Sequence, residues 1–317
     1  MCAKMRRLDR PIGTAKMEKQ DMDKRSEDLE VIDFAEEENP ETKHRDRNKS
    51  KRKKTDIITT AIFLVGIGLV IFAGIRLYGI FSDYHKSNKI YNNLEDEFVT
   101  VLPQEETDST ENSEEEELPW YQYAKVDLEG VQQTNPDAVG WILFENEKIS
   151  YPVLYSGDND TYLRTAIDKS YATAGSIFME GANNPDFEDC HTIIYGHNMK
   201  NLSMFGRLKY YKDEGYYEDH MYFQIFTNDA IYRYQIFAYS DVPEDSTIYR
   251  VPFAPGEEYT QFINDLYRHS YVDSGVTVTD SDKIITLSTC AATGYRFVVH
   301  AVRVDTYKYG TNSISAE

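Results

Sequence analysis

One cysteine and one arginine lie six residues apart near the C-terminus, where a short polar turn joins two apolar runs. The segment from Ile284 to Val304 reads IITLSTCAATGYRFVVHAVRV, with Cys290 closing the first run and Arg296 opening the second. A thiol at a strand end is presented at the rim of a sheet, and a guanidinium on the facing strand can help to hold an anion beside it. The pattern predicts a hairpin with a nucleophilic thiol that needs a histidine as its partner.

The best candidate for that partner is His197. Of the seven histidines, three are set aside by position, one in the N-terminal tail, one beside an apolar helix and one at the end of an expected helix: His44, His85 and His269. The others are His191, His197, His220 and His300. His300 alternates within a strand and His220 lies in a charged loop, whereas His197 follows the apolar strand HTIIYG. A lone histidine there would be read as a polar surface residue, but His197 occupies the same strand-end position as Cys290.

A cysteine and histidine pair of this kind supports acyl transfer through a thioester. His197 would protonate the leaving amine and later take a proton from the incoming nucleophile, and Arg296 would stabilise the oxyanion or hold the substrate backbone. A metal site would need more ligands than His191, His197 and Cys190 supply, so we expect no metal and no cofactor. With three cysteines in the chain, a Cys190–Cys290 disulfide remains an alternative in an oxidising compartment.

The elements that must position these residues are mostly short strands. From Pro119 onward, apolar runs rich in β-branched and aromatic residues alternate with turn residues, which indicates a mainly β, closed antiparallel-type barrel. The expected strands are Trp141–Phe144, Ile149–Leu154, Gly175–Met179, Thr192–Tyr195, Tyr222–Phe226, Ile231–Tyr239, Lys283–Thr289 and Phe297–Val304. Helices are expected at Val126–Gln133, Phe205–Tyr211 and Glu257–His269, the last with an apolar stripe typical of core packing.

The N-terminal part predicts a membrane anchor. Residues 1–56 have the composition of a disordered tail, and eight basic residues between Lys43 and Lys54 precede an uncharged run of nineteen residues, 57–75. The positive-inside rule then places the tail in the cytoplasm and the rest outside the cell, in preference to a cleaved signal peptide. Residues 76–118 are expected to form an acidic extracytoplasmic linker, extended between Ser87 and Leu118, that leads to a catalytic domain at 119–317.

The charge of the chain argues against nucleic acid as a partner. Residues 1–56 carry 16 Lys and Arg against 14 Asp and Glu, which leaves 18 basic residues against 40 acidic ones beyond them. Such a surface repels phosphates, and no basic stripe interleaved with aromatic residues offsets it.

These motifs resemble the signature of sortases, the membrane-anchored transpeptidases of Gram-positive bacteria. The signature consists of Thr286-Leu287-Ser288-Thr289-Cys290 followed by Arg296, together with Tyr195-Gly196-His197-Asn198. Further stretches are similar to class B sortases in particular: Asn135-Pro136-Asp137-Ala138-Val139-Gly140-Trp141-Ile142, Tyr151-Pro152-Val153, Asp158-Asn159 through Tyr162-Leu163, Gly175-Ser176-Ile177-Phe178 and Ser203-Met204-Phe205.

The resemblance implies an eight-stranded sortase barrel in which Cys290 is the nucleophile, His197 the acid and base, and Arg296 the oxyanion or substrate contact. It implies cleavage of a sorting signal after Thr in secreted proteins, with transfer to a peptidoglycan or pilin amine. Three further residues are expected to line the peptide groove: Ser288, Asn159 and Leu163. The alternatives are a cysteine endopeptidase that only hydrolyses and a catalytically inactive peptide-binding domain.

Overall fold

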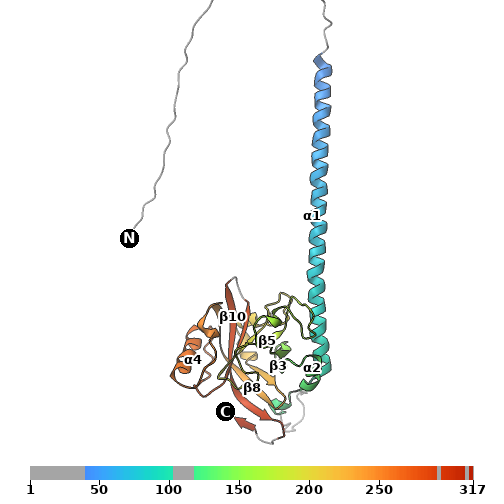
Figure 1. Cartoon of the computed structure of the whole chain (residues 1–317). Coiled ribbons are helices and arrows are strands. Elements are labelled where there is room, and N and C mark those ends of the chain that lie inside the picture. Colours follow the sequence, from blue (N-terminus) through green and yellow to red (C-terminus); the bar gives the residue numbers. More distant parts are fainter. Residues whose placement is uncertain (1–39, 103–117, 291–293, 311–313, 317) are drawn as a thin grey trace, which may run out of the picture. The chain divides into compact units, whose positions relative to one another are not determined.

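The computed structural model describes residues 40–102, 118–290, 294–310 and 314–316, and the side chains of these residues except those of 40–55, Cys290 and 314–316. The chain divides into two compact units, residues 1–68 and 69–317. The long helix α1 (Pro40–Phe98) runs through the boundary, and the strands that the structure describes all lie in the second unit (Figure 1).

Eight strands of the second unit close into a barrel. They are β3 (Ala138–Phe144), β4 (Ser150–Leu154), β5 (Ile177–Met179), β6 (His191–Tyr195), β7 (Tyr222–Phe226), β8 (Ala230–Pro243), β9 (Ile284–Cys290) and β10 (Tyr295–Lys308). Their order is β10-β8-β7-β3-β4-β5-β6-β9, and β9 pairs with β10 to complete the ring. The eight strands expected from sequence are therefore confirmed. Most pairs are antiparallel, but β4–β5 and β6–β9 are parallel.

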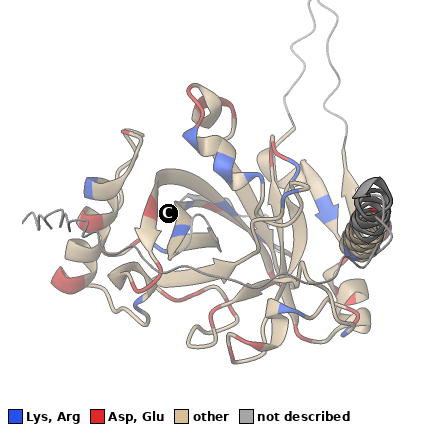
Figure 2. Ribbon diagram, turned by 90° about the horizontal axis from the view of Figure 1, so that it is seen from above, with Lys and Arg blue, Asp and Glu red and all other residues tan. Residues whose placement is uncertain are grey.

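The barrel is filled by the inward-facing side chains of its strands, because neighbouring residues of a strand point to opposite faces. Trp141 is fully buried, and its indole nitrogen Nε1 donates to Ser150 Oγ at 3.0 Å. Phe144 and Phe223 stack across the β3–β7 pair with ring centroids 5.0 Å apart. Figure 2 shows that charged residues gather on the loops and helices around the barrel, while most of the strand ribbon is uncharged.

Helix α4 (Glu257–His269) covers the outer face of β8, β9 and β10 and has the bounds expected from sequence. Its buried residues follow the pattern i, i+3, i+4, i+7 and therefore form one face of the helix: Tyr259, Phe262, Ile263 and Leu266. They pack against Phe237, Val298 and other outward-facing strand residues in a second core cluster. The prediction that this stripe serves core packing is confirmed.

The remaining described elements are short. They are β1 (Val99–Val101), β2 (Ala124–Val126), α2 (Leu128–Thr134), α3 (Tyr216–Asp219), β11 (Ile314–Ala316) on the outer edge of β10, and the 3₁₀ turns η1 (Trp120–Gln122), η2 (Thr161–Leu163), η3 (Leu208–Lys212) and η4 (Thr247–Tyr249). Helix α2 confirms the helix expected there, and its first turn is capped by Asp127, whose Oδ1 accepts from the Gly130 amide at 2.9 Å. Where a helix was expected at Phe205–Tyr211, the structure has only the shorter 3₁₀ turn η3.

The end of α1 corrects the prediction of an extended spacer between Ser87 and Leu118. Residues 87–98 are helical, and Tyr91 and Leu94 are only 3% and 7% exposed. The Tyr91 hydroxyl contacts the Gly175 carbonyl oxygen and Ser176 Oγ, both at 2.8 Å, and β1 then pairs with β2. The acidic composition suggested a solvated chain, but the apolar residues among the acids bury one face of the helix. The strongly acidic residues 103–117 lie outside the described residues.

Among the described residues, one helical segment is long and apolar enough to cross a membrane, within Asp56–Phe98. It contains the uncharged run 57–75 expected from sequence, and the large apolar side chains of that run are exposed.

Candidate active site

The site is assembled by the parallel pairing of β6 and β9. In this register Tyr195 lies opposite Ser288, and the Gly196 amide donates to the Ser288 carbonyl oxygen at 3.1 Å. Because parallel strands end at the same edge of a sheet, His197 and Cys290 each follow two residues beyond this last pair. Strand β10 returns antiparallel to β9 with Arg296 opposite Cys290. The topology therefore brings the three predicted catalytic residues to one edge of the barrel.

A cavity of about 210 Å³ opens at this edge, and we call it the His197 cavity. Five of the six predicted site residues line it: His197, Arg296, Ser288, Asn159 and Leu163. The sixth, Cys290, contributes its described backbone at the end of β9, while its side chain lies outside the described part of the chain. Residues far apart in the sequence thus line one cavity, as their motifs predicted.

His197 is held at the mouth of the cavity by its neighbours. Its Nε2 lies 2.8 Å from the Leu163 carbonyl oxygen, which can only accept, so Nε2 carries the proton and Nδ1 is the basic nitrogen. Glycine suits position 196 just before it, because an added Cβ would lie 2.6 Å from the ring of the fully buried Phe205 and 2.5 Å from Ile177 Cδ1. Burial is the main cause that lowers the pKa of His197. The Leu163 hydrogen bond opposes it in part, and the positive charges of Arg164 and Arg296 each lower the pKa by a smaller amount.

Arg296 is partly exposed, and it lines the cavity. Its Nη2 lies 3.1 Å from Glu244 Oε2, and its Nη1 donates to the Tyr295 carbonyl oxygen at 3.3 Å. The Glu244 side chain is more than half exposed, so this ion pair is solvent-screened and weak. A substrate oxygen could therefore replace Glu244 as the partner of the guanidinium at small cost.

The other predicted residues form a hydrogen-bonded wall. Ser288 is 2% exposed and its Oγ lies 2.9 Å from the Tyr249 hydroxyl. The Asn159 side-chain amide donates to the Glu180 carboxylate at 2.8 Å, and its Oδ1 accepts from the Gly181 amide at 2.8 Å. The side chain of Asn159 is thus committed to the loop after β5, which fixes the shape of that wall.

Several residues in the wall of the His197 cavity were not predicted from the sequence. Phe178, Tyr195 and Thr289 line the cavity, and Tyr195 donates through its hydroxyl to Glu180 Oε2 at 2.7 Å. Phe178 and Tyr195 stood within quoted motifs, so strand alternation could have identified them as wall positions. No sequence motif marks Glu180 or Glu244. They contact site residues only because strands that are distant in the sequence pair in the fold.

The remaining histidines and the second cysteine stay outside the cavity. His191 and His300 are buried and both contact Thr286 Oγ1, at 2.7 Å and 2.8 Å, and burial lowers the pKa of His191 to about 4 and that of His300 to about 3. Cys190 lies beside the start of β9, because its carbonyl oxygen accepts from the Ile284 amide at 2.9 Å. Ile284 and Cys290 are six residues apart, at the two ends of β9. That separation is about 20 Å, whereas disulfide-bonded Cα atoms lie within about 7 Å. The disulfide alternative is therefore excluded.

Comparison with known proteins agrees with this geometry. Residues 145–304 match the sortase domain family. The curated sortase B of Listeria monocytogenes is 32% identical over 234 residues, which cover 73% of this chain and 88% of the relative. A sortase B structure from Bacillus anthracis is 31% identical with a TM-score of 0.58, over 71% of this chain and 99% of that one. A Staphylococcus aureus sortase B–substrate complex is 32% identical with a TM-score of 0.54, over 58% and 85%.

The match to the sortase domain family, residues 145–304, contains both strand ends that border the His197 cavity. The chain therefore belongs to the sortase family of cysteine transpeptidases, and within it to class B.

Proposed function

We propose that the chain is a membrane-anchored transpeptidase that cleaves a sorting signal after Thr and transfers the secreted protein to a peptidoglycan or pilin amine. The observation that carries the proposal is the parallel β6–β9 register, with His197 and Cys290 at one edge and Arg296 opposite Cys290. The solved sortase B–substrate complex of Staphylococcus aureus supports a substrate site in this fold.

In the first half-reaction, His197 Nδ1 takes the proton of the Cys290 thiol, and the thiolate attacks the carbonyl carbon of Thr. Arg296 leaves Glu244 to stabilise the oxyanion or to hold the substrate backbone. The carbon–nitrogen bond breaks as the imidazolium gives its proton to the leaving amine, and a thioester remains on Cys290. The lowered pKa of His197 makes its imidazolium a strong proton donor for this step.

In the second half-reaction, an amine attacks the thioester carbonyl. A new carbon–nitrogen bond forms, the carbon–sulfur bond breaks, and His197 takes the amine proton and returns it to the sulfur. Water in place of the amine gives hydrolysis, the outcome that defines the endopeptidase alternative.

The groove residues have distinct parts in this proposal. Leu163 offers an apolar side chain that is 37% exposed at the cavity, while its carbonyl oxygen orients His197. Ser288, through its hydroxyl, and Asn159, through its fixed amide, shape the walls against which the sorting peptide lies.

The test is ligation by the full chain in detergent micelles. A model sorting peptide with a C-terminal label should be cleaved after Thr, with a thioacyl adduct at Cys290 detected by mass spectrometry and a ligated product when an amine is added. Hydrolysis without any ligated product would favour the endopeptidase, and no adduct would favour the inactive binding domain. Cys290→Ala is the matched control and should form neither adduct nor product.

The membrane topology is part of the proposal and has its own test. Residues 1–56 are assigned to the cytoplasm, 57–75 to the membrane and 119–317 to the cell surface. A protease added to intact cells should remove a C-terminal tag and leave an N-terminal tag protected. Protection of the C-terminal tag would reverse the assignment.

A further inference from the structure

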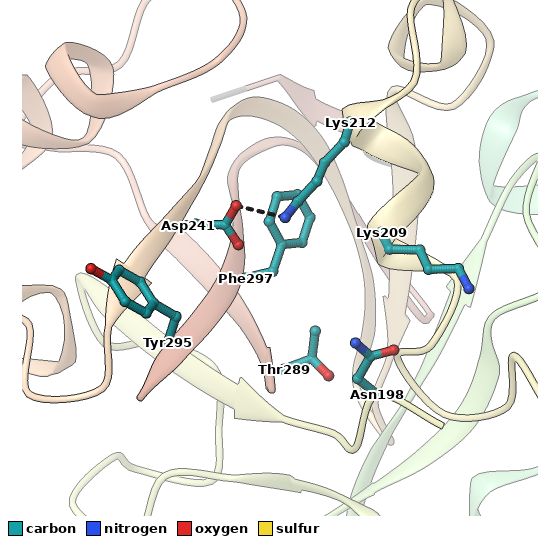
Figure 3. A pocket seen from close by; sticks show the side chains of 7 residues that line it. All are labelled: Asn198, Lys209, Lys212, Asp241, Thr289, Tyr295 and Phe297. Carbon is teal, nitrogen blue, oxygen red and sulfur yellow. Dashed lines mark hydrogen bonds and ion pairs between the residues drawn. The ribbon is translucent and has the colours of Figure 1, made fainter. Parts of the chain in front are cut away.

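A second hollow lies on the other side of the β9 end. It has a volume of about 440 Å³, and its walls come from the loop after β6, from η3, from β8 and from β9 and β10. Figure 3 shows Asn198 and Thr289 on one side and the Lys212–Asp241 ion pair beside the Phe297 ring. We call it the Lys212 pocket. Thr289 lines both this pocket and the His197 cavity, so the two hollows share one wall next to Cys290.

Two oxygen atoms of this pocket lack hydrogen-bond partners in the described part of the chain. Thr289 is 3% exposed, and its Oγ1 is buried without a partner. Asp241 uses Oδ2 to accept from Lys212 Nζ at 2.6 Å and from the Tyr271 hydroxyl at 3.1 Å, but its buried Oδ1 has no partner. Because a buried acceptor without a donor is costly, both atoms suit a ligand that brings N–H groups.

The charges of the pocket do not cancel. Lys212 is committed to Asp241 and lies 4.7 Å from the centroid of the Phe297 ring. Lys209 extends from η3 away from that ion pair, and among the described side chains it meets the ring of Tyr210 and no carboxylate (Figure 3). Its exposed ammonium is therefore left to pair with a negative group of a ligand.

We propose that the Lys212 pocket binds the amine acceptor, and that the acceptor is a peptide that carries a free carboxylate besides its amine. Asp241 Oδ1 and Thr289 Oγ1 accept hydrogen bonds from N–H groups of the peptide, and Lys209 contacts the carboxylate. The amine then passes the shared Thr289 wall to reach the thioester on Cys290, from the side opposite the sorting peptide. This inference rests on the proposed transpeptidation and assigns its second substrate.

The test measures the KM for the acceptor with triglycine and with triglycinamide, which differ in the carboxylate, at a saturating sorting peptide. The full chain in micelles should prefer triglycine by about threefold, the size of an exposed ion pair. Lys209→Gln should abolish this preference, because it removes the cation and keeps the length of the side chain. Lys125→Gln on β2 is the matched control, an exposed lysine outside both hollows, and should keep it.

Asp241 is tested by a pair of variants. Asp241→Ala should raise the KM for both acceptors about tenfold, because it removes an acceptor of hydrogen bonds. Asp241→Asn keeps a carbonyl oxygen and should recover most of the affinity. Thermal unfolding of each variant shows whether the barrel is intact, and an unfolded Asp241→Ala would leave the Asp241→Asn and Lys209→Gln results to decide.

The outcomes separate the two proposals. Ligation with an acceptor KM unaffected by Lys209→Gln and by Asp241→Ala would overturn the pocket assignment and leave the transpeptidase intact. Absence of any thioacyl adduct or ligated product in the unmodified chain would overturn the proposed function itself. If these variants raised the KM for the sorting peptide and left the KM for the acceptor unchanged, the assignment of the pocket to the acceptor would also be contradicted. The residues would then belong to the site of the first substrate.

Discussion

Strands β6, β9 and β10 carry two histidine sites that differ in their hydrogen-bond partners. In one site, His191 at the start of β6 and His300 in β10 contact Thr286 Oγ1 of β9 at 2.7 Å and 2.8 Å, and all three residues are buried. In the other site, just beyond the end of β6, the His197 side chain has one described hydrogen bond, to the Leu163 carbonyl oxygen, and borders a cavity. The interior histidines bond to other groups of the protein, whereas Nδ1 of the edge histidine has no described partner and can serve the proposed chemistry. Partner satisfaction, more than residue type, separates a structural histidine from a chemical one.

The largest expected effect comes from removing the edge histidine. His197→Ala should lower kcat/KM for ligation by about a thousandfold, because the proposed chemistry loses its acid and base. The midpoint of urea unfolding should move little, since the side chain is only partly buried at a cavity mouth. Ligation kinetics and urea unfolding on the same preparation measure both quantities. A large loss of stability with modest loss of rate would place His197 in the structural class.

The interior pair should show the opposite behaviour, as a pH dependence of stability. Their pKa values in the folded state, about 4 for His191 and about 3 for His300, lie below the ordinary value near 6.5. At a pH between the folded-state pKa of each histidine and about 6.5, the unfolded chain therefore binds more protons than the folded chain. Folding stability is fully present above about pH 6.5 and falls as the pH decreases toward 4, by on the order of 3 kcal/mol per histidine.

Urea unfolding at pH 7 and at pH 4.5 measures this loss. His300→Phe should reduce the difference between the two pH values, because one of the two buried bases is gone. His269→Asn, a change at the exposed end of α4, is the control and should leave the difference as it is. A pH dependence equal in the unmodified chain and in His300→Phe would contradict the role assigned to the buried pair.

A smaller effect is expected where α1 joins the barrel. Tyr91→Phe removes a hydroxyl that contacts the Gly175 carbonyl oxygen and Ser176 Oγ, both within the domain that carries the site. The free energy of unfolding should fall by about 1 kcal/mol, the usual value of a buried hydrogen bond. Tyr78→Phe changes an exposed tyrosine of the same helix and should cost nothing measurable. Equal unfolding curves for Tyr91→Phe and the unmodified domain would show that this contact does not stabilise it.

The strands and the position of the predicted site residues at strand ends could be predicted from the sequence. The contacts that hold those residues in place could not. Alternating apolar residues and turn residues located the eight strands, and the strand-end positions of His197 and Cys290 led to one edge. The parallel β6–β9 contact was not visible, because pairing partners depend on the whole ring. Glu180 and Glu244 were missed for the same reason. Residues 87–98 were misread, because acidic composition outweighed the buried face of Tyr91 and Leu94.

The smallest effect concerns the charge around the edge histidine. Arg164 and Arg296 both lower the pKa of His197, after burial as the main cause. Arg164→Gln removes one positive charge and should raise that pKa slightly, because the charge is screened by solvent. Chemical shifts of the His197 ring followed through a pH titration measure the change, and Arg268→Gln, remote on α4, should produce none.

The same titration joins the two histidine sites. If burial alone set the pKa values, Arg164→Gln would leave the pKa of His197 unchanged. It should leave those of His191 and His300 unchanged in any case, because burial is the main cause of their lowered pKa and no arginine charge contributes to it. An upward shift confined to His197 would show that the edge histidine is tuned by neighbouring charges that a bound substrate can alter. The interior pair is tuned by burial, which no substrate reaches. Because a ligand can change the charges around it, the edge histidine, and not the interior pair, is suited to the proposed proton transfer, which reverses between the two half-reactions.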